Sequence, residues 1–121
     1  MLKSVDVVTA STREERRKGL SNIAAIDDGS GMLFIHENEG KKSYVMRDMM
    51  FGLDIIFIDS AGYITEIHHA PLPSSESSEN ELLRYEGHGK WILEVPYKWT
   101  TRNVINIGDR IKITNYFNQY N

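Results

Sequence analysis

Asp54 and Glu94 are carboxylates that lie inside otherwise apolar, strand-like segments of the chain. A half-buried acid of this kind has a shifted proton affinity and is a candidate for acid–base chemistry. Two such groups about 5 to 10 Å apart would suit the hydrolysis of a glycosidic bond. The structural alternative is that each carboxylate accepts hydrogen bonds from loop amides or pairs with Arg47 or Arg110, because a buried acid needs partners whatever its function. We favour the structural role for both acids and predict no catalytic residue.

The segment that precedes Asp54 supplies further candidates for binding. Met46, Arg47 and Asp48 place a polarizable thioether beside two opposite charges. Core packing is the commoner use of such a cluster, but it could also form the floor of a pocket. Trp99 follows a turn, so we expect it to be partly exposed and available for stacking, whereas Trp91 is expected in the core. The candidate binding residues are Met46, Arg47, Asp48, Asp54, Glu94 and Trp99.

The histidines offer little support for a metal site. The chain has 4 of them, at His36, His68, His69 and His88. Because neighbouring residues of a strand point to opposite faces, His68 and His69 are not expected to bind the same ion. A third ligand would have to come from a distant segment. We therefore predict no metal and no cofactor.

Composition and motifs argue against several classes of function. The chain has no cysteine, which excludes disulfides, thiolate catalysis and cysteine-bound metals. It shows neither a Gly-x-Ser-x-Gly elbow nor a glycine loop for phosphate. The net charge of −3 disfavours nucleic acid and anionic membranes as partners. Because we see no leader and no membrane-spanning segment, we expect a cytoplasmic location for the sequence as it stands.

The elements that must position these residues are mainly strands. Alternating or short apolar runs predict strands at Lys3–Thr9, Met32–His36, Lys41–Asp48, Leu53–Asp59, Tyr63–His69, Trp91–Val95 and Asp109–Phe117. Turn-like stretches at 37–40 and 60–62 both end in glycine, which predicts two hairpins. The run Leu53–Ile58 is apolar on both faces, so we expect this strand to be covered on both sides.

Helix is expected in two short places. Thr12 precedes Glu15 by the spacing of a capping box, and Ser11 precedes Glu14 by the same spacing, so a helix is predicted over about Thr12–Leu20. One further helical turn is expected over Trp99–Val104. The length of 121 residues suits a single domain, residues 1–121. The predicted fold is all-β, an antiparallel β-sandwich or barrel with one short N-terminal helix.

Several short motifs, taken in order, resemble a known family. They are Gly19-Leu20, Gly31–Phe34, Gly52–Asp59, Leu93–Pro96 and Gly108–Ile111. This ordered set is similar to domain-of-unknown-function family 192 (DUF192, uncharacterised ACR), and it covers nearly the whole chain. The resemblance implies a jelly-roll-like β-sandwich. The family has no established catalytic residues that would carry over to this sequence.

The chain departs from the family pattern around the candidate binding segment. Val45 stands where the family usually has tryptophan, Arg47 where it has lysine, and Asp48 where it has asparagine. Met49 replaces a threonine and Gly52 a proline. If the family uses this segment for binding, the departures imply either a different specificity in this chain or the loss of the site.

Three hypotheses for function follow from these residues. The first is a non-enzymatic β-sandwich that binds a small molecule or a protein in a cleft near the segment Met46–Asp54. The second is a hydrolase-like enzyme that uses Asp54 and Glu94. The third is a structural or assembly subunit. We expect a monomer or a weak homo-oligomer.

Overall fold

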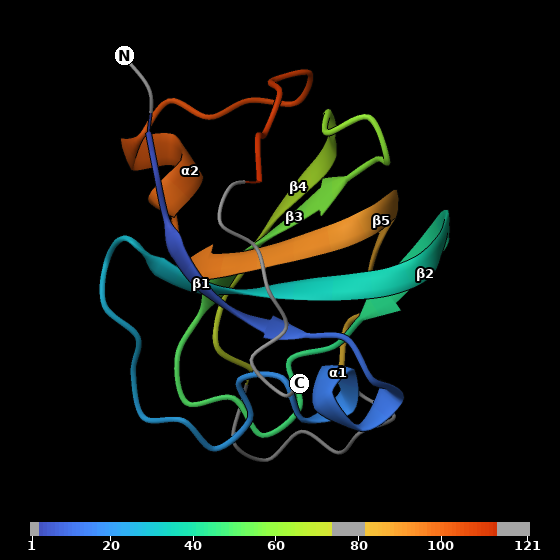
Figure 1. Ribbon diagram of the computed structural model, residues 1–121. Helices are drawn as coiled ribbons and strands as arrows, with labels where there is room; N and C mark the ends of the chain where they lie inside the picture. The colour runs from blue at the N-terminus through green and yellow to red at the C-terminus, as the bar shows by residue number, and fades with distance from the viewer. Residues whose placement is uncertain (1–2, 74–81, 114–121) are drawn as a thin grey trace.

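The structure of the protein is a computed structural model that describes residues 3–73 and 82–113 (Figure 1). Strands account for most of its regular structure, which confirms the mainly β prediction. In chain order the elements are β1 (Asp6–Ala10), α1 (Arg13–Lys18), β2 (Ser30–Tyr44), β3 (Leu53–Ile58), β4 (Ile64–Ala70), β5 (Tyr85–Pro96) and α2 (Trp99–Arg102).

The strands form one mixed sheet in the order β1-β2-β5-β3-β4. The pairs β2–β5, β5–β3 and β3–β4 are antiparallel, but β1 runs parallel to β2. The prediction of an entirely antiparallel arrangement is therefore wrong at β1. The finer prediction of a jelly-roll sandwich or a barrel is not confirmed, because all the described strands belong to this one sheet.

The short N-terminal helix α1 begins at a complete capping box. The backbone N–H of Glu15 donates to Thr12 Oγ1 at 3.0 Å, and Glu15 Oε1 accepts from the N–H groups of Thr12 and Ser11, each at 2.9 Å. Gly19 ends the helix at φ 47°, in the positive range that glycine tolerates best. The predicted helix is confirmed, and of its two possible caps the structure uses Thr12 with Glu15.

The first predicted hairpin is wrong. The stretch 37–40 does not reverse the chain, because β2 continues from Ser30 to Tyr44 and pairs with β5 on both sides of this stretch. The pairing register shifts between Ile35 and Gly40, so the turn-like residues form an irregularity within one long strand.

The second predicted hairpin is confirmed by β3 and β4. Asp59 begins its turn by accepting from the amides of Ala61 at 3.0 Å and Tyr63 at 2.9 Å. Gly62 has φ 93°, which explains the glycine at this place. The register shifts by one residue between Phe57 and Ile58. This bulge decides which residue of β4 lies opposite each residue of β3.

Apolar side chains cover both faces of the sheet. The α1 face carries a buried cluster that includes Leu53, Ile55 and Phe57 of β3 together with Leu20 after α1. The α2 face carries a second cluster, made by Leu33, Ile56, Ile58, Ile64, Leu93, Val95 and Trp99. Figure 1 shows α1 and α2 on opposite sides of the sheet. All six residues of β3 are buried, which confirms the prediction that this strand is covered on both sides.

The chain after α2 returns over the α2 face. Ile111 and Ile113 pack against its apolar cluster, as their alternation predicts. The expected strand Asp109–Phe117 does not form over residues 109–113. Within this stretch, an isolated bridge joins Arg110 to Tyr63. The remainder of that predicted strand lies outside the described residues.

Candidate functional site

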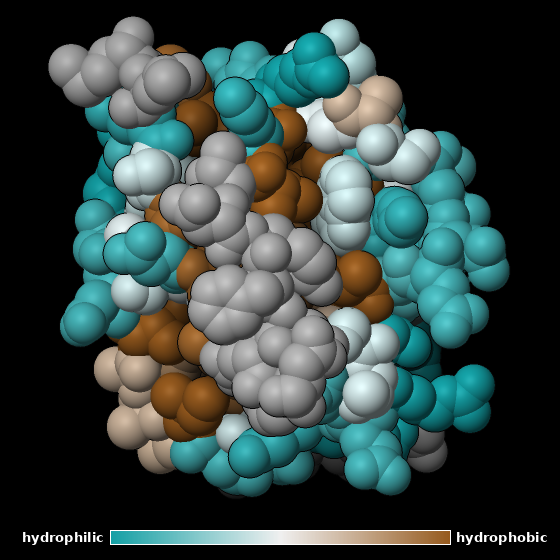
Figure 2. All heavy atoms as spheres, in the orientation of Figure 1, coloured by the Kyte–Doolittle hydropathy of each residue, from teal (hydrophilic) through white to brown (hydrophobic). Residues whose placement is uncertain are grey.

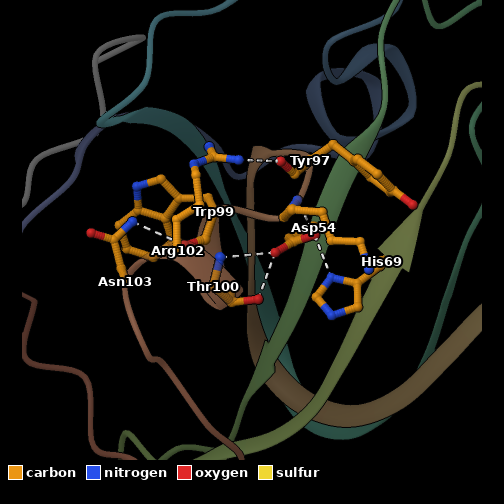
Figure 3. A network of polar contacts seen from close by, with 8 residues as sticks. Asp54, His69, Tyr97, Trp99, Thr100, Arg102 and Asn103 are labelled. Atoms are coloured by element: carbon orange, nitrogen blue, oxygen red, sulfur yellow. Dashed lines mark hydrogen bonds and ion pairs between the residues drawn. The ribbon is translucent and has the colours of Figure 1, made fainter.

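Asp54 lies at the centre of the polar contacts on the α2 face. Its side chain is fully buried and accepts four hydrogen bonds. Oδ1 accepts from Nδ1 of His69 at 2.7 Å and from the backbone N–H of Lys98 at 2.8 Å. Oδ2 accepts from the backbone N–H of Thr100 at 2.9 Å and from its hydroxyl at 2.6 Å (Figure 3).

Asp54 is thus satisfied by several donors, as predicted, but the donors are different ones. They come from the start of α2 and from β4, rather than from Arg47, Arg110 or the turn before β3. Lys98, the residue at the N-terminal cap of α2, has φ 66° and supplies no side-chain cap to the helix. Asp54 replaces that missing cap from a distant strand, because a carboxylate satisfies the free N–H groups of a first helical turn.

His69 is placed opposite Asp54 by the pairing of β4 with β3. Its ring also meets Tyr97 edge to face, with centroids 6.4 Å apart. The side chain remains 35% exposed, whereas that of Asp54 is wholly buried. The pair therefore joins a buried carboxylate to an imidazole that reaches solvent, an arrangement that fixes both the ring and its tautomer.

A groove of about 530 Å³ opens beside this histidine. Its apolar walls are Ile67 of β4 and the side chains of Val104, Ile105 and Ile107, which follow α2. The polar groups of the lining come from His69, Thr100, Thr101 and Asn106. The groove thus combines apolar and polar groups in its lining, a combination that small-molecule sites also use.

Apolar side chains also reach the surface elsewhere. Figure 2 shows such side chains in brown between teal polar regions on the side of the molecule in view. Val7 and Val8 of β1 are exposed, as are Val104 and Ile107 after α2.

The binding candidates before β3 lie apart from Asp54. Met46 is buried in the cluster of the α1 face. Arg47 is half-buried, and its carbonyl accepts from the Ser21 hydroxyl at 2.6 Å. Asp48 is exposed at φ 52°, and its carbonyl accepts from the N–H of Asn22 at 2.8 Å. Asp54 points to the other face, so the structure does not bring this segment and Asp54 together in one cleft.

Glu94 also lies on the face opposite Asp54. It is 5% exposed and is paired in register with Met32 and Ile55, both of the α1 face. Burial raises the pKa of its carboxyl group to about 8. The hydrolase hypothesis needs two carboxylates that converge on one substrate. Because the sheet separates Glu94 from Asp54, these two acids do not form such a pair.

A second polar group occupies the α1 face near Glu94. Nε2 of His36 and the hydroxyl of Tyr44 lie 2.5 Å apart. Burial, followed by the charges of Arg16 and Lys42, lowers the pKa of His36 to about 4. Burial raises the pKa of Tyr44, and the charge of Glu94 raises it further. This half-buried pair lies on the α1 face and forms no part of the groove.

The remaining residues that the sequence analysis considered have structural roles. Trp99 is only 6% exposed and packs in the α2-face cluster, so the prediction of a partly exposed stacking residue is wrong. Its ring is drawn inward because α2 docks directly on the sheet. His68 lies on the face opposite His69, as predicted, and its Nε2 lies 2.7 Å from the carbonyl of Glu86. Within residues 3–73 and 82–113, no three histidines or carboxylates gather into a metal-binding group.

His69 and Thr100 are the members of this site that the sequence analysis missed. The sequence around Thr100 gives no indication of this contact, since no local pattern relates Thr100 to Asp54. A partial indication exists for His69, because the predicted hairpin of Leu53–Asp59 with Tyr63–His69 already places the two histidines near Asp54. Only the bulge at Thr65 of β4, opposite Phe57 and Ile58, decides between them.

The chain belongs to the DUF192 family of uncharacterized ACR proteins, whose model matches residues 1–113. The fold is similar to that of a "putative transcription regulator" from Sinorhizobium meliloti 1021, with 26% identity and a TM-score of 0.77 over 88% of this chain and 79% of the other. It is also similar to a protein of unknown function from Novosphingobium aromaticivorans DSM 12444, with 26% identity and a TM-score of 0.76 over 88% and 74% of the two chains. No curated protein matches the sequence.

Proposed function

We propose that the protein is a non-enzymatic β-structured binding module whose ligand site is the groove beside α2. The observation that carries the proposal is the contact between Asp54 and His69. A buried carboxylate with four donors holds an imidazole at the edge of a groove of about 530 Å³. Such a fixed side chain is what a binding site needs to orient a ligand.

The polar groups around the groove favour binding over catalysis. Thr100, whose hydroxyl donates to Asp54, is only 2% exposed, which suits a structural contact better than attack on a substrate. Glu94, the second acid of the hydrolase hypothesis, lies on the other face of the sheet. The imidazole and the side chains of Thr101 and Asn106 are polar groups suited to hydrogen bonding with a small molecule.

A small molecule is also a better partner than nucleic acid or a membrane. The net charge of −3 opposes phosphate binding, and the description of one similar structure as a transcription regulator does not change that charge. Among the described residues, no helix is long and apolar enough to cross a bilayer.

A ligand screen followed by thermal unfolding tests the proposal. The screen uses a library of small metabolites with the unchanged protein and with two variants, His69→Gln and His68→Gln. The second variant is the matched control, because His68 is the neighbouring histidine on the opposite face. The expected result is a compound that raises the Tm of the unchanged protein and of His68→Gln, and has a much smaller effect on His69→Gln. A compound that stabilises all three proteins equally would place its site outside the groove and contradict the proposal.

A further inference from the structure

We infer that the groove beside α2 selects ligands that carry a primary ammonium group on an apolar chain, and that this ammonium competes with a proton for Nε2 of His69. The inference rests on the proposed function, since it names the ligand class of the same site. Its three supports are the tautomer of His69, the charge of Asp54 and the chemistry of the groove.

The first support is the tautomer of His69. A carboxylate can only accept hydrogen bonds, so the 2.7 Å contact with Asp54 requires the proton of the neutral imidazole on Nδ1. The lone pair is then on Nε2. Figure 3 shows the second ring nitrogen of His69 directed away from Asp54. The carboxylate also makes this nitrogen a stronger acceptor, as carboxylates do for metal-bound histidines.

The second support is the charge of Asp54. Its partners are two backbone amides, the Thr100 hydroxyl and His69. Within the described part of the chain, no lysine or arginine forms an ion pair with it. A buried carboxylate without a cationic partner favours any cation that can reach its hydrogen-bonded imidazole. A proton on His69 is one such cation, and a ligand ammonium at Nε2 is the other.

The other charged groups around His69 are already engaged. Arg102 Nη2 lies 2.7 Å from the Asp28 carboxylate, and its Nη1 donates to the carbonyl of Tyr97 at 2.8 Å. The ammonium of Lys98 lies over the ring of Tyr97, 5.5 Å from its centroid. Neither cation pairs with Asp54, so the negative charge behind His69 is left for a ligand to balance.

The third support is the groove itself. Ile67, Val104, Ile105 and Ile107 form apolar walls that suit an alkyl chain, and Val104 and Ile107 are among the most exposed apolar residues described. The amide of Asn106 offers an additional acceptor oxygen for a second ammonium N–H. An alkyl ammonium therefore matches both the apolar and the polar lining.

The test compares three probes that share a chain and differ in the head group: hexylammonium, 1-hexanol and hexanoate. Binding is followed by NMR through the imidazole nitrogens of His69 and the methyl groups of Ile105 and Ile107. Spectra of the free protein should first show the proton on Nδ1. At mildly alkaline pH, hexylammonium should then bind tightest and hexanoate weakest. In acid its affinity should fall, because a proton then takes the lone pair of Nε2.

Variants separate this inference from the proposed function. His68→Gln should keep the order of the three probes, whereas His69→Gln should bind all three alike and without pH dependence. A proton on Nε2 in the free protein at mildly alkaline pH, or hexanoate binding there as tightly as hexylammonium, would overturn the ammonium inference. Equal binding of all three probes in the groove would overturn it too, yet leave the groove as the binding site. If no probe moves the groove resonances, both the inference and the proposed site are wrong.

Discussion

Asp54 and Glu94 lie on the adjacent strands β3 and β5, yet their side chains leave the sheet in opposite directions. Asp54 is paired in register with Val95, and Glu94 with Ile55. Asp54 meets four donors on the α2 face, whereas no described side chain donates a hydrogen bond to Glu94 on the α1 face. The two acids are therefore expected to respond in different ways to mutation and to pH.

The Asp54→Ala variant should be strongly destabilised, because it leaves the buried amide of Thr100 and the part-buried amide of Lys98 without their acceptor. The expected loss is on the order of 3 kcal/mol of unfolding free energy. Thr100→Val removes a single donor, and its loss should be nearer ~1 kcal/mol. Urea denaturation measures both. An Asp54→Ala protein with an unchanged midpoint that no longer binds ligands would contradict the structural role.

Glu94 should make the protein less stable as the pH rises. Burial raises the pKa of the folded carboxyl from 4.5 to about 8, so the folded state holds its proton more tightly than the unfolded chain. The stabilisation is complete below pH 4.5 and is lost as the pH rises through about 8. Glu94→Gln should therefore match the unchanged protein in acid and exceed it by a few kcal/mol above pH 8. Equal slopes of stability against pH in the two proteins would argue against a neutral, buried Glu94.

The contribution of His36 to stability should have the opposite dependence on pH. Burial and the nearby charge of Arg16 lower the pKa of the folded imidazole from 6.5 to about 4. Its contribution to stability is therefore present above pH 6.5 and is lost as the pH falls through about 4. His36→Gln should lose less stability over that interval than the unchanged protein. NMR titration of the His36 ring checks the cause directly, and a midpoint near 6.5 would contradict it.

Gly31 and Gly40 offer a matched pair of substitutions within β2. A Cβ atom at Gly31 would lie 2.3 Å from the backbone oxygen of Glu94, whereas a Cβ at Gly40 would meet nothing within 4 Å. Gly31→Ala should lose about 2 kcal/mol or more, because the backbone of β5 has to move. Gly40→Ala should be close to neutral. Thermal unfolding of both variants tests the packing of β2 against β5, and equal Tm values would contradict the close approach at Gly31.

Much of the local structure could be predicted because its causes lie close together in sequence. The capping box set the start of α1, and the two-sided apolar pattern of Leu53–Ile58 identified a covered strand. The β3–β4 hairpin followed from its glycine turn. The parallel pairing of β1 with β2 and the continuous β2 depend on partners far away in the chain, so turn composition alone gave a wrong hairpin there.

The contacts of the candidate site could be predicted only in part, for the same reason. A regular hairpin whose pairing continued that of Ile58 with Ile64 would place His68 opposite Asp54. The bulge between Phe57 and Ile58 shifts the register by one and brings His69 there instead. Nothing in the local sequence specifies that shift. The hydrogen bond from Thr100 is even less predictable, since it crosses 46 residues of chain.

The capping of α2 by Asp54 has a consequence for the order of folding. The amides at the start of this single helical turn find their acceptor 44 and 46 residues earlier in the chain, on β3. A turn of this length is unstable alone, and its stabilising contact exists only once β3 has paired with β5. Helix α2 therefore forms late, after the non-local contacts of the sheet. Hydrogen exchange at Lys98 and Thr100 then reports the opening of β3 from the sheet rather than fraying of a helix end.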